Sequence, residues 1–271
     1  MSKKLSIIIP SYKDPLLHKT IDSLLENSEL GDKLEIVVVF DGYWSDKPIR
    51  DDPRIKIVHL GGNRGMRGAI NAGVAVSNGE FFMRLDEHCS FGKGYDRIMT
   101  DACEPNQIIT ARRYFLDPIK WEIMDMPYVD YEKLVIQRDK EGNEVKFAGQ
   151  RWHSRDKERK DILIDETTAM QGSMWIMPRK WWDDVIGGEL QTEGYGPTYQ
   201  DSVEVTMKTW QAGGKLMLHK GTWFAHKHRS FSRTHQEGSP ENPSNREAGW
   251  KYSLCVWGDY YQKVIRPRFK I

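Results

Sequence analysis

The stretch "GEFFMRLDEHCSFG", residues 79–92, decides how this chain can fold. Residues 81–85 are mostly apolar, which is typical of a buried strand, and Asp86, Glu87 and His88 follow directly at its end. Burying a carboxylate without a partner costs several kcal/mol. The end of this strand must therefore meet compensating charges, and the neighbouring segments indicate where it lies.

Three more segments in the first sixty residues read as buried strands, at 4–12, 33–42 and 54–61. Apolar spacing predicts a helix over 17–25 and a second helix over 67–79, closed by Gly79. This alternation predicts an α/β fold, a mostly parallel sheet flanked by helices on both faces. Ligands of such sheets bind at the carboxyl ends of the strands. The polar residues predicted there are Ser11, Tyr12, Asp41, Asp86 and His88.

Composition excludes some classes of protein. The chain has 271 residues, 39% hydrophobic and 29% charged, as in ordinary globular proteins. Forty Lys and Arg against 39 Asp and Glu give a net charge of +1, so any polyanion must bind to local patches. Three Cys without metal-type spacing favour a reducing compartment. With no long apolar run and no signal-peptide pattern, we expect no membrane span and a cytoplasmic location.

The D-E-H triplet itself allows two interpretations. In an extended segment alternate residues share a face, so Asp86 and His88 would point together and Glu87 away from them. A carboxylate and an imidazole side by side make half of a divalent-metal site. They could equally be a hydrogen-bonded pair at a strand end, and local sequence leaves both interpretations open.

Four segments in order resemble the nucleotide-sugar glycosyltransferases of the GT-A fold, in a family 2-like form. They are "SIIIPSYKD" at 6–14, "VVVFDG" at 37–42, "GGNRGMRGAINAG" at 61–73 and the D-x-H triplet. The resemblance implies a Rossmann-like GT-A fold and an enzyme, a hexosyl- or pentosyltransferase. It also implies a UDP-sugar donor and Mn²⁺ (or Mg²⁺), held by the triplet against the sugar diphosphate.

The same resemblance assigns the donor site. Tyr12 is expected to stack on the base, Asp41 to accept a hydrogen bond from base or ribose, and Arg67 to face the diphosphate. Five further residues are expected to contact the donor. They are Pro10 and Ser11 in the nucleotide loop, Arg64 before the phosphate-side helix, and Gly172 and Trp175 in the sugar pocket.

A second resemblance covers residues 194–214, a glycine-rich loop followed by an amphipathic helix. The segment is similar to W-G-G-E-N-x-E of the polypeptide N-acetylgalactosaminyltransferases, a D-x-H subgroup, and places Asp201 and Glu204 at its acidic, catalytic positions. Gly-Tyr-Gly replaces the Trp-Gly-Gly triplet, which leaves the sugar open. Asp201 would also suit the base of an inverting enzyme, whereas the subgroup retains configuration. Alternatively, the two acidic residues have no catalytic role and only stabilise the helix, because negative charges near a helix N-terminus interact favourably with its dipole.

The segment "GTWFAHKHRSFSRTH", 221–235, is expected to supply the third metal ligand. The resemblance selects His226, with His228 as the alternative because both lie on one side of a strand. Without a metal, the segment would be a basic loop.

We expect a single GT-A domain over residues 1–271. Residues 1–92 form its nucleotide-sugar half, 93–229 its acceptor and catalytic half with an acceptor-side extension, and 230–271 a mobile loop and a C-terminal helix. The loop is expected over 230–249, which is rich in Ser, Pro, Asn and Gly.

Alternatives of another class are a sugar-nucleotide pyrophosphorylase, whose Gly-rich loop after the first strand this chain lacks, and a non-catalytic sugar-binding module. The acceptor is open between protein, glycan and a hydroxymethylated base of DNA. Basic segments at 146–160, 227–233 and 266–270 fit DNA slightly better than a neutral glycan.

Overall fold

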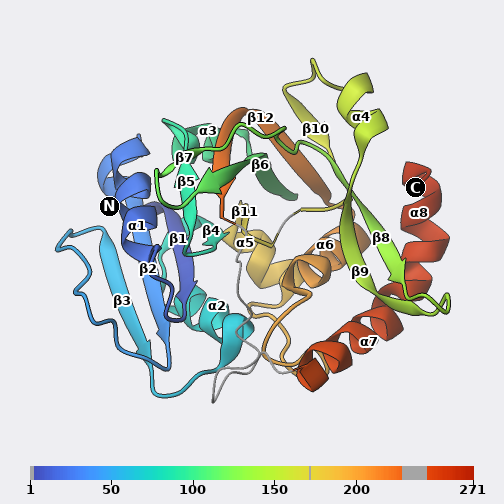
Figure 1. Ribbon diagram of the computed structural model, residues 1–271, viewed down its shortest axis with the longest axis horizontal. Helices are drawn as coiled ribbons and strands as arrows, with labels where there is room; N and C mark the ends of the chain where they lie inside the picture. The colour runs from blue at the N-terminus through green and yellow to red at the C-terminus, as the bar shows by residue number, and fades with distance from the viewer. Residues whose placement is uncertain (1–2, 171, 228–242) are drawn as a thin grey trace.

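The first four strands form one continuous parallel sheet. The computed structural model describes residues 3–170, 172–227 and 243–271 (Figure 1). Strands β1 (Lys3–Ser11), β2 (Leu34–Asp41), β3 (Ile55–Leu60) and β4 (Gly79–Leu85) lie in the order β4-β1-β2-β3, all parallel. Between them run helices α1 (Leu17–Asn27) and α2 (Gly65–Val76), with a 3₁₀ turn at Gly31–Lys33. The predicted strands and helices of this half are confirmed.

One boundary differs from the prediction. Helix α2 ends at Val76, because Ser77 is extended and its N–H bonds back to the Val74 carbonyl. Gly79 is therefore the first residue of β4 and does not close the helix.

The second half extends the sheet and makes it mixed. It contributes β5 (Cys89–Phe91), β6 (Gln107–Asp117), β7 (Glu122–Ile123), β10 (Ile164–Glu166), β11 (Met174–Pro178) and β12 (Lys215–His226). Strand β11 lies antiparallel between β4 and β6, and β12 runs parallel to β6. The α/β class is as expected, but parallel pairing is limited to β4-β1-β2-β3 and to β6-β12.

Helices cover both faces of this sheet, as the sequence predicts. Ile7 and Ile9 pack with α1 and α3 (Tyr95–Ala102), whereas Ile8, between them, packs with α2 and α6 (Asp201–Gln211). A short helix α5 (Arg179–Trp181) and a π-helical turn (Trp182–Ile186) complete the second layer.

Outside the main sheet lies a hairpin of β8 (Glu132–Arg138) and β9 (Glu144–Arg151), followed by α4 (His153–Glu158). Figure 1 shows it beside α7 (Pro243–Tyr260), at the opposite end of the molecule from β3. The chain ends in a π-helical turn (Tyr261–Ile265) and α8 (Arg266–Phe269). An apolar cluster that includes Leu134, Phe147, Met207 and Trp257 joins the hairpin to α6 and α7.

The prediction of a loop over 230–249 is wrong for the last residues of that range. Residues 230–242 lie outside the described part of the chain, but 243–249 belong to helix α7. Gly249 is buried against the backbone of Tyr195, where an added Cβ would lie 2.3 Å from the Tyr195 carbonyl oxygen. Composition suggested a loop because this tertiary contact is not visible locally. Among the described residues, no helix combines the length and the apolar character needed to cross a bilayer.

Candidate metal and donor site

Three potential metal ligands meet at the carboxyl edge of the sheet. Asp86 and His88 lie in the connection between β4 and β5, and β5 pairs antiparallel with the end of β12, where His226 stands opposite Cys89. The Nε2 atoms of His226 and His88 lie 3.2 Å and 3.6 Å from Asp86 Oδ2. One ligand atom from each residue lies within 4.8 Å of the others. The strand register thus brings together the three residues that the sequence singled out; His228 lies outside the described residues.

A second carboxylate, that of Asp14, contacts the cluster on the side of His88 that faces away from Asp86. Asp14 Oδ2 lies 3.0 Å from Nδ1 of His88, the ring nitrogen that does not face Asp86. Glu87 points away, as expected, and accepts the backbone N–H of Tyr12. Sequence reasoning missed Asp14; the available signal was an acidic residue three positions after the carboxyl end of β1.

Arg84 compensates much of the buried negative charge. Its Nη1 lies 2.7 Å from Asp86 Oδ1, and its Nε lies 3.8 Å from Asp201 Oδ2. Burial alone would raise the pKa of Asp86, but the Arg84 guanidinium and the two imidazoles hold that pKa well below its ordinary value. Arg84 was also missed, although a charged residue inside an apolar strand was the signal for it.

Asp201 lies next to the same cluster. It is the first residue of α6 and is buried. Gly172 is its neighbour, since a Cβ added there would lie 3.6 Å from Asp201 Oδ1. The carbonyl of the next residue, Ser173, accepts the N–H of Asp86 at 2.9 Å. Gly172 and Asp201 are therefore adjacent to the candidate metal ligands.

The expected donor loop borders a pocket of about 430 Å³ between the segments that follow β1 and β2. Ser11 Oγ lies 2.6 Å from the Tyr43 hydroxyl, and the largely buried Tyr12 ring meets Tyr43 edge to face. Pro10 is half-buried within β1. Trp44, which sequence reasoning missed, is 77% exposed on the pocket wall and stacks on His59. Stacking of Tyr12 on a base stays a prediction, and Trp44 is the better exposed ring.

Asp41 has a defined structural role. Its two carboxylate oxygens accept the backbone N–H groups of Arg64 at 2.6 Å and Gly65 at 2.8 Å, so it anchors the start of α2 to the end of β2. The Arg64 side chain is exposed beside this helix start.

Comparison with known proteins identifies the family. The family model described as "Glycosyl transferase family 2" matches residues 6–185. The chain belongs to this family. It is a glycosyltransferase by class, as its motifs predicted.

Two relatives of this family 2 glycosyltransferase are informative. It is 23% identical over 237 residues to polypeptide N-acetylgalactosaminyltransferase 4 of Mus musculus, covering 82% of this chain and 39% of the mouse protein. The crystal structure of GalNAc-T7 with UDP, GalNAc and Mn²⁺ superposes with a TM-score of 0.72 at 16% identity, over 98% of this chain and 50% of that one. The chain thus spans half or less of the length of either relative. The structural match confirms the GT-A fold.

Three residues of this glycosyltransferase lie elsewhere than the sequence suggested. Arg67 was expected to face the diphosphate, but it is fully buried in an ion pair with Glu204, and it also donates to the carbonyls of Tyr199 and Gln191. Glu204, expected to be catalytic, is instead fully buried in ion pairs with Arg67 and Lys208.

Trp175 was expected in the sugar pocket. It is instead a core residue, packed against Phe82 and Trp182, because β11 inserts into the centre of the sheet.

The donor set of the cluster fits a divalent metal ion. One carboxylate oxygen and two imidazole nitrogens converge, and Asp14 orients one imidazole from the far side, as outer-sphere carboxylates of metal sites do.

Proposed function

We propose that this glycosyltransferase moves a sugar from a nucleoside-diphosphate sugar, a UDP-sugar, to an acceptor hydroxyl, with retention of configuration. The observation that carries the proposal is the convergence of Asp86, His88 and His226 beside Asp201, at the edge where this fold binds its ligands. The similar structure of GalNAc-T7, which contains UDP and Mn²⁺, supports the choice of uracil and of an Mn²⁺-dependent reaction.

The three ligands would hold Mn²⁺ in preference to Mg²⁺, because two of them are nitrogen atoms and Mg²⁺ prefers oxygen. When bound, the cation would offset the charge that develops on the leaving diphosphate. Arg84 keeps Asp86 charged and oriented, and Asp14 holds His88 with its Nε2 towards Asp86.

The remaining residues position the two substrates. The Trp44 and Tyr43 side of the loop pocket supports binding of the base. Ser11 Oγ lies within hydrogen-bond distance of the Tyr43 hydroxyl, and Asp41 orders the backbone at the start of α2. In transfer, the bond between the anomeric carbon and the phosphate oxygen breaks while the acceptor oxygen bonds to that carbon. With retention, the proton of the acceptor passes to the leaving phosphate oxygen, and Asp201 positions the acceptor. With inversion, Asp201 would take that proton as general base.

Different observations bear on a protein acceptor and on a DNA acceptor. A protein hydroxyl is supported by the resemblance to polypeptide transferases. DNA was suggested by basic segments, but four arginines in the described parts of these segments are already paired. Arg151 lies near Asp156, Arg155 and Arg159 bind Asp165, and Arg268 binds Glu166. The charges of these four arginines are largely compensated within the protein, which weakens the case for DNA.

A release assay tests the proposed function. Purified protein is incubated with UDP-sugars and Mn²⁺, and UDP is quantified with and without EDTA, alongside the His226→Ala variant. UDP release that EDTA and His226→Ala abolish is expected, with the thermal midpoint of the variant showing that it folds. Full activity in EDTA would contradict the metal assignment. UDP should stabilise the protein only with Mn²⁺, whereas a pyrophosphorylase would prefer the triphosphate and a sugar-binding module would ignore both.

A further inference from the structure

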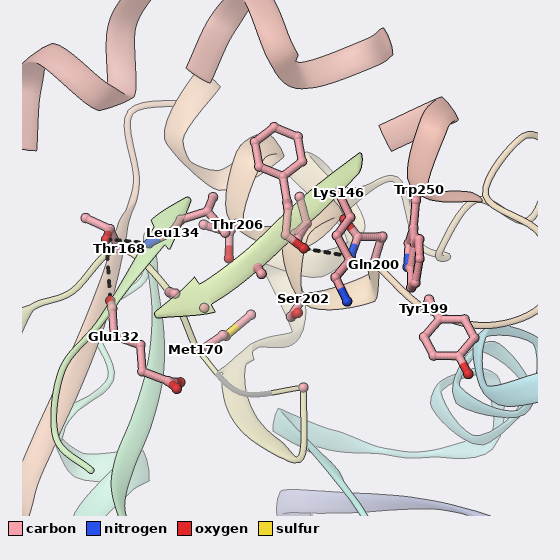
Figure 2. A pocket seen from close by; sticks show the side chains of 16 residues that line it. Glu132, Leu134, Lys146, Thr168, Met170, Tyr199, Gln200, Ser202, Thr206 and Trp250 are labelled. Carbon is pink, nitrogen blue, oxygen red and sulfur yellow. Dashed lines mark hydrogen bonds between the residues drawn. The ribbon is translucent and has the colours of Figure 1, made fainter. Parts of the chain in front are cut away.

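A second pocket opens next to Asp201, on the acceptor side. Its volume is about 330 Å³, and hairpin β8–β9, the start of α6 and helix α7 enclose it (Figure 2). Gly172 and Ser202 line it, and both adjoin Asp201. Because Asp201 also contacts Arg84, which binds Asp86, only two side chains separate this pocket from the candidate metal ligands. A hydroxyl held in the pocket can therefore approach the donor.

The two ends of the pocket differ in charge. Figure 2 shows Glu132 and Thr168 on one side, and Lys146, Tyr199 and Trp250 on the other. Glu132 lies 3.8 Å from Arg113, so its carboxylate has a cationic partner inside the protein.

The other end holds a cation, Lys146. Its ammonium lies 4.3 Å from the centre of the Trp250 ring, and both residues line the pocket. In the part of the chain that the structure describes, Lys146 forms no ion pair with a carboxylate. Burial, and to a smaller extent the charge of Arg246 on α7, lower the pKa of Lys146. An anion bound beside Lys146 would stabilise its charged form.

The backbone holds the pocket in a strained form. Tyr199 and Gln200 both have positive φ angles, 69° and 54°, which are costly for residues with side chains. This conformation lets Gln200 donate to the Phe147 carbonyl at 3.3 Å, while its amide oxygen is buried without a hydrogen-bond partner among the described residues. Strained backbone and a buried amide oxygen without a hydrogen-bond donor are both expected at a binding site, where a bound ligand can supply the missing donor.

We propose that this pocket binds the acceptor, and that its Lys146 end selects an acceptor carrying a phosphate group. The inference rests on the proposed function and names the acceptor chemistry of that same site. A phosphate monoester carries between one and two negative charges at neutral pH and accepts several charge-assisted hydrogen bonds, which matches the Lys146 ammonium with its three N–H donors. The Gln200 amide and Ser202 hydroxyl can bind the polar part of the acceptor that lies between its phosphate and its reacting hydroxyl.

Matched acceptor pairs test this inference. One pair is hydroxymethyl-deoxycytidine and its 5′-monophosphate, and the other is N-acetylglucosamine and its 6-phosphate. Transfer from a UDP-sugar with Mn²⁺ is measured as kcat/KM for wild type, Lys146→Met and the control Lys140→Met, an exposed lysine at the tip of the same hairpin. We expect wild type and the control to prefer the phosphorylated member of at least one pair by roughly tenfold or more. That ratio should fall towards one in Lys146→Met.

The outcomes separate this inference from the proposed function. Preference within the first pair identifies a nucleotide acceptor, and preference within the second a phosphorylated glycan. Equal use of both members by wild type, or an unchanged ratio in Lys146→Met, overturns the inference while the transferase assignment stands. If wild type releases no UDP from any UDP-sugar, even without acceptor, the proposed function fails and the inference with it.

Discussion

Asp14 Oδ2 lies 3.0 Å from Nδ1 of His88, although the two residues are 74 positions apart in the chain. The contact fixes which ring nitrogen of His88 carries its proton and turns the other nitrogen towards Asp86. Outer-sphere carboxylates of this kind orient metal-binding histidines and raise their basicity. Asp14 therefore belongs to the candidate metal site although it is not one of the three ligands.

The first prediction concerns this contact. Asp14→Asn should weaken Mn²⁺ binding about 10- to 100-fold, as loss of an outer-sphere partner does. Isothermal titration of the protein with Mn²⁺ measures the affinity directly and does not depend on finding the acceptor. Asp46→Asn is the matched control, because Asp46 is exposed on the neighbouring loop. Equal Mn²⁺ affinity of Asp14→Asn and wild type would remove Asp14 from the site.

Asp41 allows its structural and its binding role to be separated. Replacing it with Ala removes two hydrogen bonds to the start of α2 and should lower the free energy of unfolding by about 1–2 kcal/mol. If Asp41 also contacts the donor, UDP affinity should fall roughly tenfold as well. Urea denaturation gives the first quantity and titration with UDP and Mn²⁺ the second. A folded variant that binds UDP as tightly as wild type would show that Asp41 is a capping residue only.

The sequence predicts much of this site because the signals are local. Apolar runs locate the ends of β1, β2 and β4, and parallel pairing brings those ends to one edge. His226 falls at the same edge because β11 is antiparallel to both β4 and β6, so β6 and its parallel partner β12 run in the direction of β4.

Other features depend on contacts between distant segments. The Arg67–Glu204 pair joins residues 137 positions apart, and no local pattern distinguishes a buried arginine from one that faces a phosphate. Trp175 follows a glycine turn, as expected, but the insertion of β11 between two strands places it in the core. Arg84 becomes interpretable only when Asp86 and Asp201 are seen on either side of its guanidinium.

The Arg67–Glu204 ion pair is predicted to contribute strongly to the free energy of unfolding. Both side chains are fully buried, so Arg67→Met removes one of the two cations that bind the buried Glu204 carboxylate and leaves Lys208 as the other; it should cost about 3 kcal/mol of unfolding free energy. The double variant with Glu204→Met should lose less than the sum of the two single variants, as measured by urea denaturation. Arg50→Met, in an exposed pair with Asp22, is the control and should cost less than about 1 kcal/mol. Additive losses in the double variant would show that the two residues are not coupled.

Stability in acid should depend on Asp165. Burial alone would raise the pKa of this carboxyl, but hydrogen bonds from Arg159 and Tyr131 bring it to about 2 from an ordinary 3.8. Because the pKa of this carboxyl is lower in the folded state, its charged form stabilises the folded state at pH values above the pKa of the unfolded state. That contribution is lost as the pH falls through about 4 towards 2. The stability difference between wild type and Asp165→Asn should therefore shrink between about pH 6 and pH 3. Asp161→Asn, at an exposed neighbour, should show no such trend, and a constant difference for Asp165→Asn would refute the assignment.

The last prediction concerns Asp201 and the stereochemistry of transfer. Asp201 lies between Arg84 and Gly172, next to the acceptor pocket, so Asp201→Asn should reduce transfer by at least 100-fold, the scale of a lost acid–base or positioning group. That loss is expected with either mechanism and cannot distinguish them. The configuration of the product can, since the proton NMR coupling at the anomeric carbon reports it directly.

Retention is the expected result. The reason is the resemblance of the segment that carries Asp201 and Glu204 to the D-x-H subgroup, which retains configuration, while Glu204 itself is occupied by Arg67 and Lys208. If the product keeps the donor configuration, the leaving phosphate oxygen accepts the proton and Asp201 acts by positioning the acceptor. An inverted product, together with rescue of Asp201→Ala by a small added carboxylate such as formate, would establish Asp201 as the general base and overturn the retaining mechanism.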